Sequence, residues 1–273
     1  MKSVLLHVND DAGQESRLLA ALAISRQHGA RLTCIQVTPV SDYVVTDPFG
    51  GMHQVAMLFE HLAAQAVEAR TRLEARLSSE QVAWDWSVHD GGVAATIINR
   101  SLFADLIVLS QEGHTERAAA RSLPLVADVA IHARTPVLAV PVDGQAFDPG
   151  GIAVIAWNGA PEAAHAVRAA LPMLRRASAV HIITLAEDTD VPVDGIRRYL
   201  EDHGITAGCS PHSLNEKNSR RSALPSCRSA SCRLCRDGCL WSLAFPRGGS
   251  WRGVAPYAGT KYCPAVVGTL TST

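Results

Sequence analysis

The sequence predicts an α/β fold: an open parallel five-stranded sheet with helices on both faces, present once complete and once truncated. Short apolar runs alternate with longer amphipathic stretches, which is the pattern of βαβ units. The same unit also begins twice, since KSVLLHVND at 2–10 and GIAVIAWNG at 151–159 each precede an Ala-rich helical stretch. A period of about 150 residues indicates two domains, because solenoid repeats are roughly 20–50 residues long.

The first copy can be read element by element. Its strands are expected at Ser3–Val8, Leu32–Val37, Val82–Val88, Asp105–Ser110 and Pro136–Val142. Its helices are expected at about 12–28, 52–77, 92–103 and 121–132. The run Ser3–Val8 is almost continuously apolar, as a strand buried on both faces should be. Right-handed crossovers between these strands predict a parallel sheet covered by helices on both faces.

The second copy starts in the same way and then loses its periodicity. A strand, a helix and a second strand at 179–185 are recognisable, but after about residue 206 the chain becomes rich in Cys, Ser and Arg. We therefore expect a complete domain at 1–145, the N-terminal part of a second domain at 151–215, and an aberrant tail at 216–273.

Charge separates the same parts. Hydrophobic residues make up 47% and charged residues 19% of the chain, which is typical of a globular protein. The formal net charge of -1 hides a net -8 over residues 1–206 and a net +7 over 207–273. The quickly acidic start does not resemble a signal peptide, and no apolar run approaches the roughly 20 residues that span a bilayer. We expect a cytoplasmic protein without a membrane partner.

Candidate ligand-binding residues follow the predicted strands. Asn9 and Asp10 end the first strand, and Ser110–Gly113 follow the fourth. In open parallel sheets, ligands bind at the carboxyl ends of the strands, where the strand order reverses. A carboxylate there could accept hydrogen bonds from a ribose or an adenine, and a Gly-containing turn could offer N–H groups to phosphates. The alternative is that Asp10 or Asp11 only caps the following helix.

The chain resembles the universal stress protein family in its tandem form. The resemblance covers 1–142 and about 151–206, and depends on the VND strand end, on ADLIVLSQEGH with TPVLAVP downstream, and on IAWNGAPEAAHAVRAALPML. It implies an α/β fold, dimerisation, and a family with both ATP-binding and non-binding branches. Nucleotide-binding members carry an Asp after strand one and, after strand four, Gly, two residues, Gly, nine residues, then Gly-Ser or Gly-Thr.

This pattern is only partly kept in the first copy. The resemblance assigns Asp10 to the Asp, Val37 to the residue that meets adenine, and Ser110 and Gly113 to the first two glycines. Leu123-Pro124 stands where Gly-Ser is expected. Leu obstructs a phosphate, and Pro lacks an N–H donor. The sequence therefore predicts weakened ATP binding, with ATP, ADP or AMP as candidate ligands and no certain cofactor.

The second copy offers a related set of candidates. Asn158 replaces the Asp and keeps a hydrogen-bonding group without the charge, while Gly159 and Leu185 complete the candidate pocket.

The tail has three interpretations. Four cysteines spaced C-x4-C-x2-C-x3-C could bind zinc or an iron–sulfur cluster: Cys227, Cys232, Cys235 and Cys239. Alternatively, a basic tail with Trp241, Trp251 and Tyr257 could contact nucleic acid. We favour the third interpretation, a reading-frame error. We therefore expect no metal site in the tail and do not favour nucleic acid as a partner.

The frame argument depends on the genetic code alone. Trp has the single codon TGG, which reads as GGN, a Gly codon, one base later. Trp241 and Trp251 then become Gly, nine residues, Gly, the spacing of the family's second and third glycines. The break would lie around residues 215–222.

Other motifs give no enzyme. The chain has no HExxH, nucleophile elbow, Walker A sequence or G-x-G-x-x-G, and the single early cysteine, Cys34, is expected to pack in a strand. No nucleophile–base set is recognisable, so slow ATP hydrolysis is the most that we expect. We predict a stress-response protein that binds or senses a nucleotide or other ligand and pairs with itself, as a homodimer or between its own domains. The alternatives are a structural partner protein that binds no nucleotide, and binding of metal or nucleic acid through the tail.

Overall fold

The computed structural model describes residues 1–38, 52–111, 125–142, 147–157, 159–184, 193–211, 240–243 and 265–267. Its first half contains five strands: β1 (Ser3–Val8), β2 (Arg31–Thr38), β3 (Trp84–Asp90), β4 (Leu106–Gln111) and β5 (Val137–Pro141). The helices between them are α1 (Gln14–His28), α3 (Met52–Ser79), α4 (Val93–Arg100), the 3-10 turn η1 (Ser101–Phe103) and α5 (Leu125–His132). These elements match the sequence-based expectation in type and order.

The second half repeats this arrangement. Its strands are β6 (Ile152–Trp157), β7 (Ala179–Thr184), β8 (Ala207–Pro211), β9 (Leu240–Leu243) and β10 (Ala265–Val267). Its described helices are α6 (Pro161–Leu174) and α7 (Val193–Asp202). None of the helices in the described ranges combines the length and the apolar character needed to cross a membrane.

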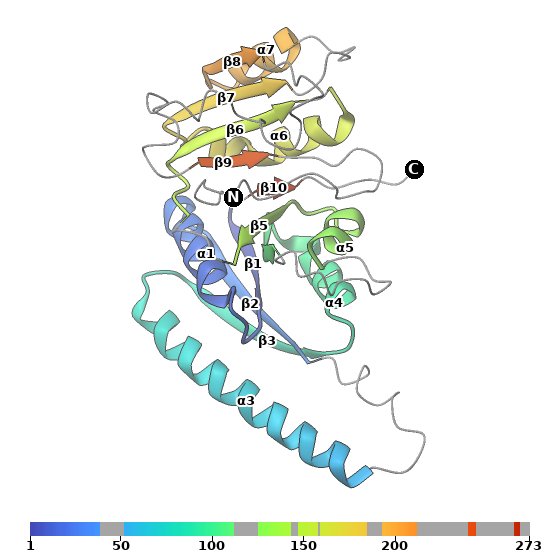
Figure 1. Ribbon diagram of the computed structural model, residues 1–273. Helices are drawn as coiled ribbons and strands as arrows, with labels where there is room; N and C mark the ends of the chain where they lie inside the picture. Colours follow the sequence, from blue (N-terminus) through green and yellow to red (C-terminus); the bar gives the residue numbers. More distant parts are fainter. Residues whose placement is uncertain are drawn as a thin grey trace, which may run out of the picture.

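The ten strands form one continuous sheet in the order β3-β2-β1-β4-β5-β10-β9-β6-β7-β8. Within each half the neighbouring strands are parallel, which confirms the predicted fold class. The halves meet edge to edge where β10 runs antiparallel to β5, with Val266 opposite Leu138. Figure 1 shows the two halves stacked about this junction, with the N-terminus beside it.

Two short strands, at 240–243 and 265–267, come from the tail. The lack of a regular β–helix–β layout in the tail stays a prediction, because its other residues lie outside the described ranges. β9 pairs in parallel with β6, and β10 pairs in parallel with β9, so they take the places that β4 and β5 hold in the first half. The shared strand order explains the result, because the edges of β6 and β5 would otherwise leave backbone N–H and C=O groups unpaired.

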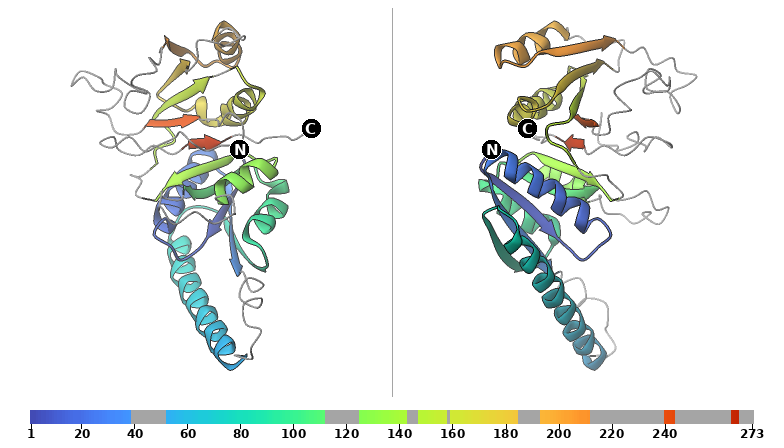
Figure 2. Two further views of the ribbon diagram at one scale, coloured as in Figure 1. Left: turned by 45° about the vertical axis from the view of Figure 1, so that its right-hand side comes forward. Right: turned by 90° about the vertical axis from the view of Figure 1, so that its left-hand side faces the viewer.

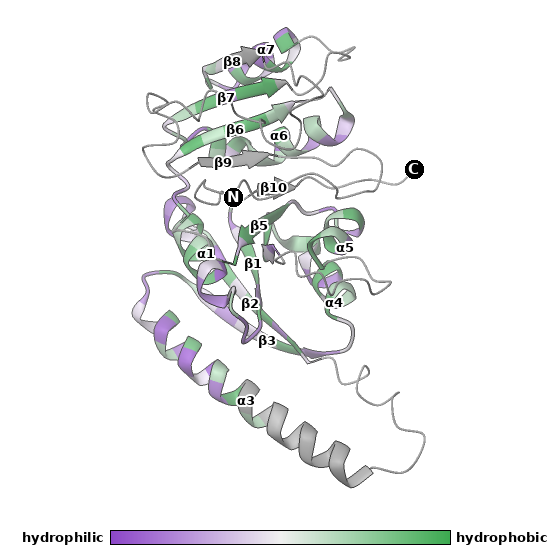
Figure 3. Cartoon of the chain, viewed as in Figure 1, coloured by the Kyte–Doolittle hydropathy of each residue, from purple (hydrophilic) through white to green (hydrophobic). Residues whose placement is uncertain are grey.

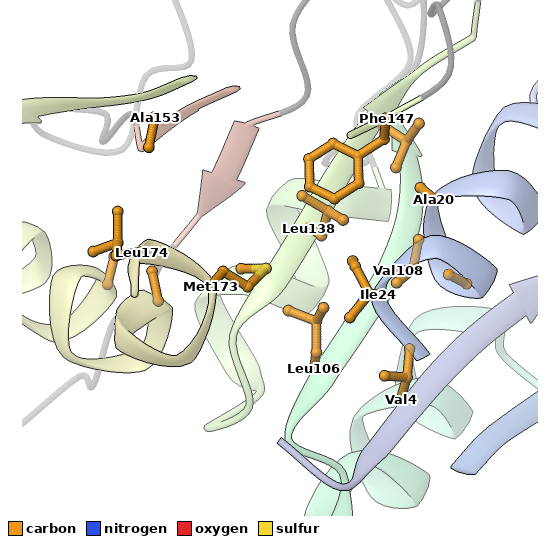
Figure 4. Packing of buried hydrophobic residues seen from close by; sticks show 14 of the residues in the cluster. Val4, Ala20, Ile24, Leu106, Val108, Leu138, Phe147, Ala153, Met173 and Leu174 are labelled. Atoms are coloured by element: carbon orange, nitrogen blue, oxygen red, sulfur yellow. The ribbon is translucent and has the colours of Figure 1, made fainter. Parts of the chain in front are cut away.

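Two hydrophobic cores cover the two faces of the first half of the sheet. Alternate residues of β1 divide between them: Val4, Leu6 and Val8 face α1, whereas Leu5 faces α4 and α5. The first core continues from one half into the other, and Figure 4 shows Phe147 of the connection beside Leu138. Figure 2 shows helices on both sides of the sheet, as the continuously apolar strands require.

Among the described side chains of the long helix α3, those toward its C-terminal end contact the body. Leu77 is fully buried, and Arg76 pairs with Glu15 of α1 at 2.7 Å. The N-terminal half of the helix extends away from the sheet (Figures 1 and 2). In Figure 3 strands β6 and β7 are mainly hydrophobic, whereas the part of α3 that is coloured mixes both kinds of residue.

Candidate functional site

The candidate site lies at the carboxyl ends of β1 and β4. The chain leaves β1 toward β2 on one side, whereas β4 lies on the other side of β1, so the strand order reverses between β1 and β4. This is the position at which open α/β sheets bind ligands. The loop 9–13 after β1 and Ser110 near the end of β4 therefore form the described part of the site.

The loop after β1 is shaped by Asp11. Its Oδ1 accepts a hydrogen bond from the N–H of Gly13 at 2.8 Å, and its carbonyl accepts one from the N–H of Gln14 at 3.1 Å. An Asp that bonds the backbone two residues ahead forms a local turn of its own. Helix α1 consequently begins at Gln14, two residues later than expected, and its N-cap is Gly13, without a side-chain capping hydrogen bond. Asp11 forms the turn that precedes the helix.

A buried guanidinium holds this loop against the sheet. The side chain of Arg17, in the first turn of α1, is only 2% exposed, and its ion pair with Asp11 spans 2.9 Å. Its nitrogens donate to His7 O (3.2 Å), Asn9 O (3.1 Å), Gln14 Oε1 (3.1 Å), Ser110 Oγ (2.6 Å) and both Asp11 carboxylate oxygens (2.9 and 3.1 Å). Such multiple pairing is what allows a charged side chain to be buried.

Ser110 and Gly13 are packed closely on the other side of this guanidinium. A Cβ at position 13 would lie only 2.2 Å from Oγ of Ser110 and 3.0 Å from its Cβ. The Ser110 hydroxyl accepts from Arg17 and lies 3.3 Å from the carbonyl oxygen of Gly13, to which it donates. The loop and the end of β4 are therefore joined without space between them.

Asp10 points away from this cluster. Its carboxylate is 66% exposed and lies 3.4 Å from Arg72 of α3. An exposed ion pair of this kind contributes about 0–1 kcal/mol, so it leaves the carboxylate accessible to a ligand. Asn9 is more constrained, because its N–H donates to Gln14 Oε1 and its amide nitrogen donates to Asp11.

A family model describes the first half of the chain. The universal stress protein family model matches residues 1–141. The chain belongs to the universal stress protein family. A universal stress protein from Archaeoglobus fulgidus DSM 4304 has 13% identity, covers 98% of this chain and 96% of its own, and has a TM-score of 0.69. A putative universal stress protein from Pseudomonas aeruginosa UCBPP-PA14 has 14% identity, 98% and 93% coverage and a TM-score of 0.53.

These similarities establish the fold over nearly the whole chain. No curated protein sequence matches this universal stress protein.

The structure brings together only part of the predicted nucleotide site. Asn9, Asp10 and Ser110 lie at one edge, and Val37 follows at the end of β2, half-buried against the core on the α4 and α5 face. Gly113 and the Leu123-Pro124 pair lie outside the described residues.

The second candidate pocket is described at one position. Gly159 follows β6 with a φ of 75°, a left-handed conformation that favours glycine, whereas Asn158 and Leu185 lie outside the described residues. Trp157, the last residue of β6, is 5% exposed, and its Nε1 has no hydrogen-bond partner among the described residues.

Two residues of the site were missed by the sequence analysis. Arg17 lies on the buried face of α1 together with Leu18, Ala21 and Ile24. The helical spacing of these four residues was the sequence signal that Arg17 would be buried. His7 lies within the apolar run of β1. Burial, followed by the charge of Arg17, lowers the pKa of His7 from 6.5 to about 4, so the ring stays neutral at physiological pH.

Among the described residues, neither a reactive cysteine nor a metal cluster accompanies this site. Cys34 is fully buried in the core, and burial raises the pKa of its thiol from 9.0 to about 12, which suits a packing role. The described residues contain no cluster of three or more His, Cys, Asp or Glu that could hold a metal ion. The four tail cysteines of the proposed metal motif lie outside the described ranges.

Proposed function

We propose that this universal stress protein is a ligand-binding or sensing module that takes an adenine nucleotide at the carboxyl edge of β1 and β4. The observation that carries the proposal is the exposed carboxylate of Asp10 beside a loop held rigidly at the reversal of strand order. A fixed loop at this edge is what a binding site requires, because little ordering is then needed when the ligand arrives.

The proposal gives each predicted residue a role. Asp10 accepts hydrogen bonds from the ribose or the adenine, and Val37 provides an apolar contact for the base. Ser110 and Gly113 border the phosphates, and Leu123-Pro124 weakens that part of the site. Affinity for ATP is therefore low, and we infer binding without turnover, with slow hydrolysis as the upper limit.

Equilibrium dialysis with ATP, ADP and AMP tests this function. Asp10→Ala should abolish binding of each nucleotide, because the ribose or adenine loses its acceptor. Asp194→Ala is the matched control, since Asp194 is an 80% exposed carboxylate on α7, far along the sheet from β1. Equal binding by wild type and Asp10→Ala would exclude the proposed role.

One observation favours the alternative, a structural partner protein that binds no nucleotide. Asp11, Arg17 and Ser110 satisfy one another, so three polar groups at the edge are already engaged. Under this alternative the protein acts through its surfaces, and none of the three nucleotides binds in the dialysis experiment.

We also infer that self-pairing occurs within the chain. β10 covers the edge of β5, so a second copy cannot pair with that edge. A homodimer would have to form through a different surface. Sedimentation equilibrium distinguishes the two forms, because internal pairing predicts the mass of one 29.1 kDa chain. The tail is proposed to bind neither metal nor nucleic acid, and the cytoplasm is the proposed location.

A further inference from the structure

We propose that Arg17 is a positioning residue of this site that also neutralises Asp11, so that Asp10 alone presents negative charge to a ligand at loop 9–13. The inference rests on the proposed function and adds to it a reason for the loop's shape and for the part of the ligand that the loop contacts.

The shape follows from the segments that the guanidinium joins. Arg17 bonds the carbonyls of His7 at the end of β1 and of Asn9 in the loop, and it also bonds Ser110 of β4. The planar, forked guanidinium can reach all three segments at once, whereas the single ammonium of a lysine cannot. Arg17 therefore fixes the position of the loop relative to both strands.

Arg17 also compensates the negative charge of Asp11. Asp11 is the carboxylate within ion-pair distance of Arg17 in the described part of the chain, and both of its oxygens accept from the same nitrogen, Nη1. Removal of Arg17 would leave this carboxylate uncompensated beside Asp10. A second negative charge at the edge repels phosphate groups but has little effect on an uncharged nucleoside.

The accessible groups indicate which end of a nucleotide meets the loop. Asp10 is an acceptor, and Asn9 already uses its amide nitrogen on Asp11. A carboxylate acceptor suits the hydroxyls of a ribose or the amino group of adenine, not a phosphate. The loop thus contacts the nucleoside part of the ligand.

The experiment compares Arg17→Met with the double variant Arg17→Met/Asp11→Asn, and uses Arg168→Met as the control at an exposed position on α6. Circular dichroism first establishes that each protein is folded. Amide hydrogen exchange by mass spectrometry then reports the loop 9–14, and calorimetry gives the Kd for ATP and for adenosine.

In Arg17→Met we expect the loop amides to exchange at least about tenfold faster, since they lose a fixed set of partners. We expect the Kd for ATP to rise roughly three- to tenfold more than the Kd for adenosine, because of the released Asp11 charge. The double variant should remove that difference but leave the fast exchange. The control should behave as wild type.

Each other outcome counts against the inference. Unchanged amide hydrogen exchange in the loop would exclude a positioning role for Arg17. ATP binding that is unchanged or tighter in Arg17→Met would exclude that role as well. Equal weakening for ATP and adenosine excludes charge compensation. If Arg17→Met fails to fold, Arg17→Lys replaces it, and it should loosen the loop while keeping the wild-type ratio of the two Kd values. Wild-type protein that binds neither ligand would overturn the proposed function, and the hydrogen exchange alone would then decide the role of Arg17.

Discussion

Replacement of Gly13 by Ala should destabilise the protein because the new methyl group would clash with a neighbouring side chain. Gly13 has φ -89° and ψ -6°, a conformation that alanine adopts freely. The obstacle is Ser110, whose Oγ would lie 2.2 Å from the new methyl group and whose Cβ would lie 3.0 Å from it. The hydroxyl would have to move, and it would lose its contact with Arg17.

The size of the effect can be estimated from its two parts. Overpacking typically costs about 1–3 kcal/mol. A displaced hydrogen bond to a charged group costs roughly 1.5–3 kcal/mol when it is lost completely. We expect Gly13→Ala to lower the free energy of unfolding by about 2–4 kcal/mol.

The same substitution should cost less in a Ser110→Gly background. There both clashing atoms are gone, although Arg17 Nη1 at 3.2 Å remains a tight contact. The restriction of the unfolded chain by Gly→Ala, about 0.4–1 kcal/mol, offsets part of the remaining cost. Urea denaturation of the wild type, both single variants and the double variant gives the coupling energy between the two positions. An equal cost of Gly13→Ala in both backgrounds would refute the packing argument.

Three further predictions concern the rest of the chain. The folded-state pKa of His7 is lowered from 6.5 to about 4, so the full stability contributed by its neutral form is present above pH 6.5. As the pH falls to 4, roughly 3 kcal/mol of the free energy of unfolding should be lost. Urea titrations at several pH values measure this loss, and His7→Gln should remove it. Gly195→Ala, inside α7 with nothing within 4 Å, should stabilise by about 0.5–1 kcal/mol, whereas Gly204→Ala, at φ +73°, should destabilise in the same assay. Cys34 should resist iodoacetamide at pH 8 in the folded protein and react in urea, as peptide mapping by mass spectrometry would reveal, because its thiol is buried and its pKa is raised to about 12.

The sheet could be predicted because its strands are buried on both faces. β1 and β4 are almost continuously apolar, so their pattern and order sufficed to place them in one parallel sheet. Short strands are harder: β9 has four residues and β10 three, too few for any period to be visible. Their positions follow from the repeated strand order, which is a property of the whole fold.

The site was less predictable because it depends on side chains that meet only in the folded chain. A pair of adjacent carboxylates gave no means of choosing between capping and ligand contact. In the structure Asp11 forms the turn and Asp10 faces solvent, and Arg17 makes this division by drawing Asp11 inward. A buried arginine contradicts the general rule that charged residues lie outside. It escaped notice for that reason.

The frame hypothesis for the tail makes the last prediction. In the first half, the place beside β1 is filled by β4, six residues whose four leading members are fully buried. The equivalent β9 has four residues and follows a Cys- and Arg-rich segment. Such a short strand after a polar segment buries less apolar surface than a central strand usually does. If the frame breaks near residues 215–222, resequencing the gene over codons 210–230 should reveal a one-base change whose correction turns Trp241 and Trp251 into glycines. The corrected protein should unfold in urea at a higher midpoint and with a larger m-value, because a longer strand and its helix would bury more surface. Stoichiometric zinc on the present protein, lost on Cys232→Ser, would contradict the hypothesis, as would DNA whose shifted reading lacks an apolar strand.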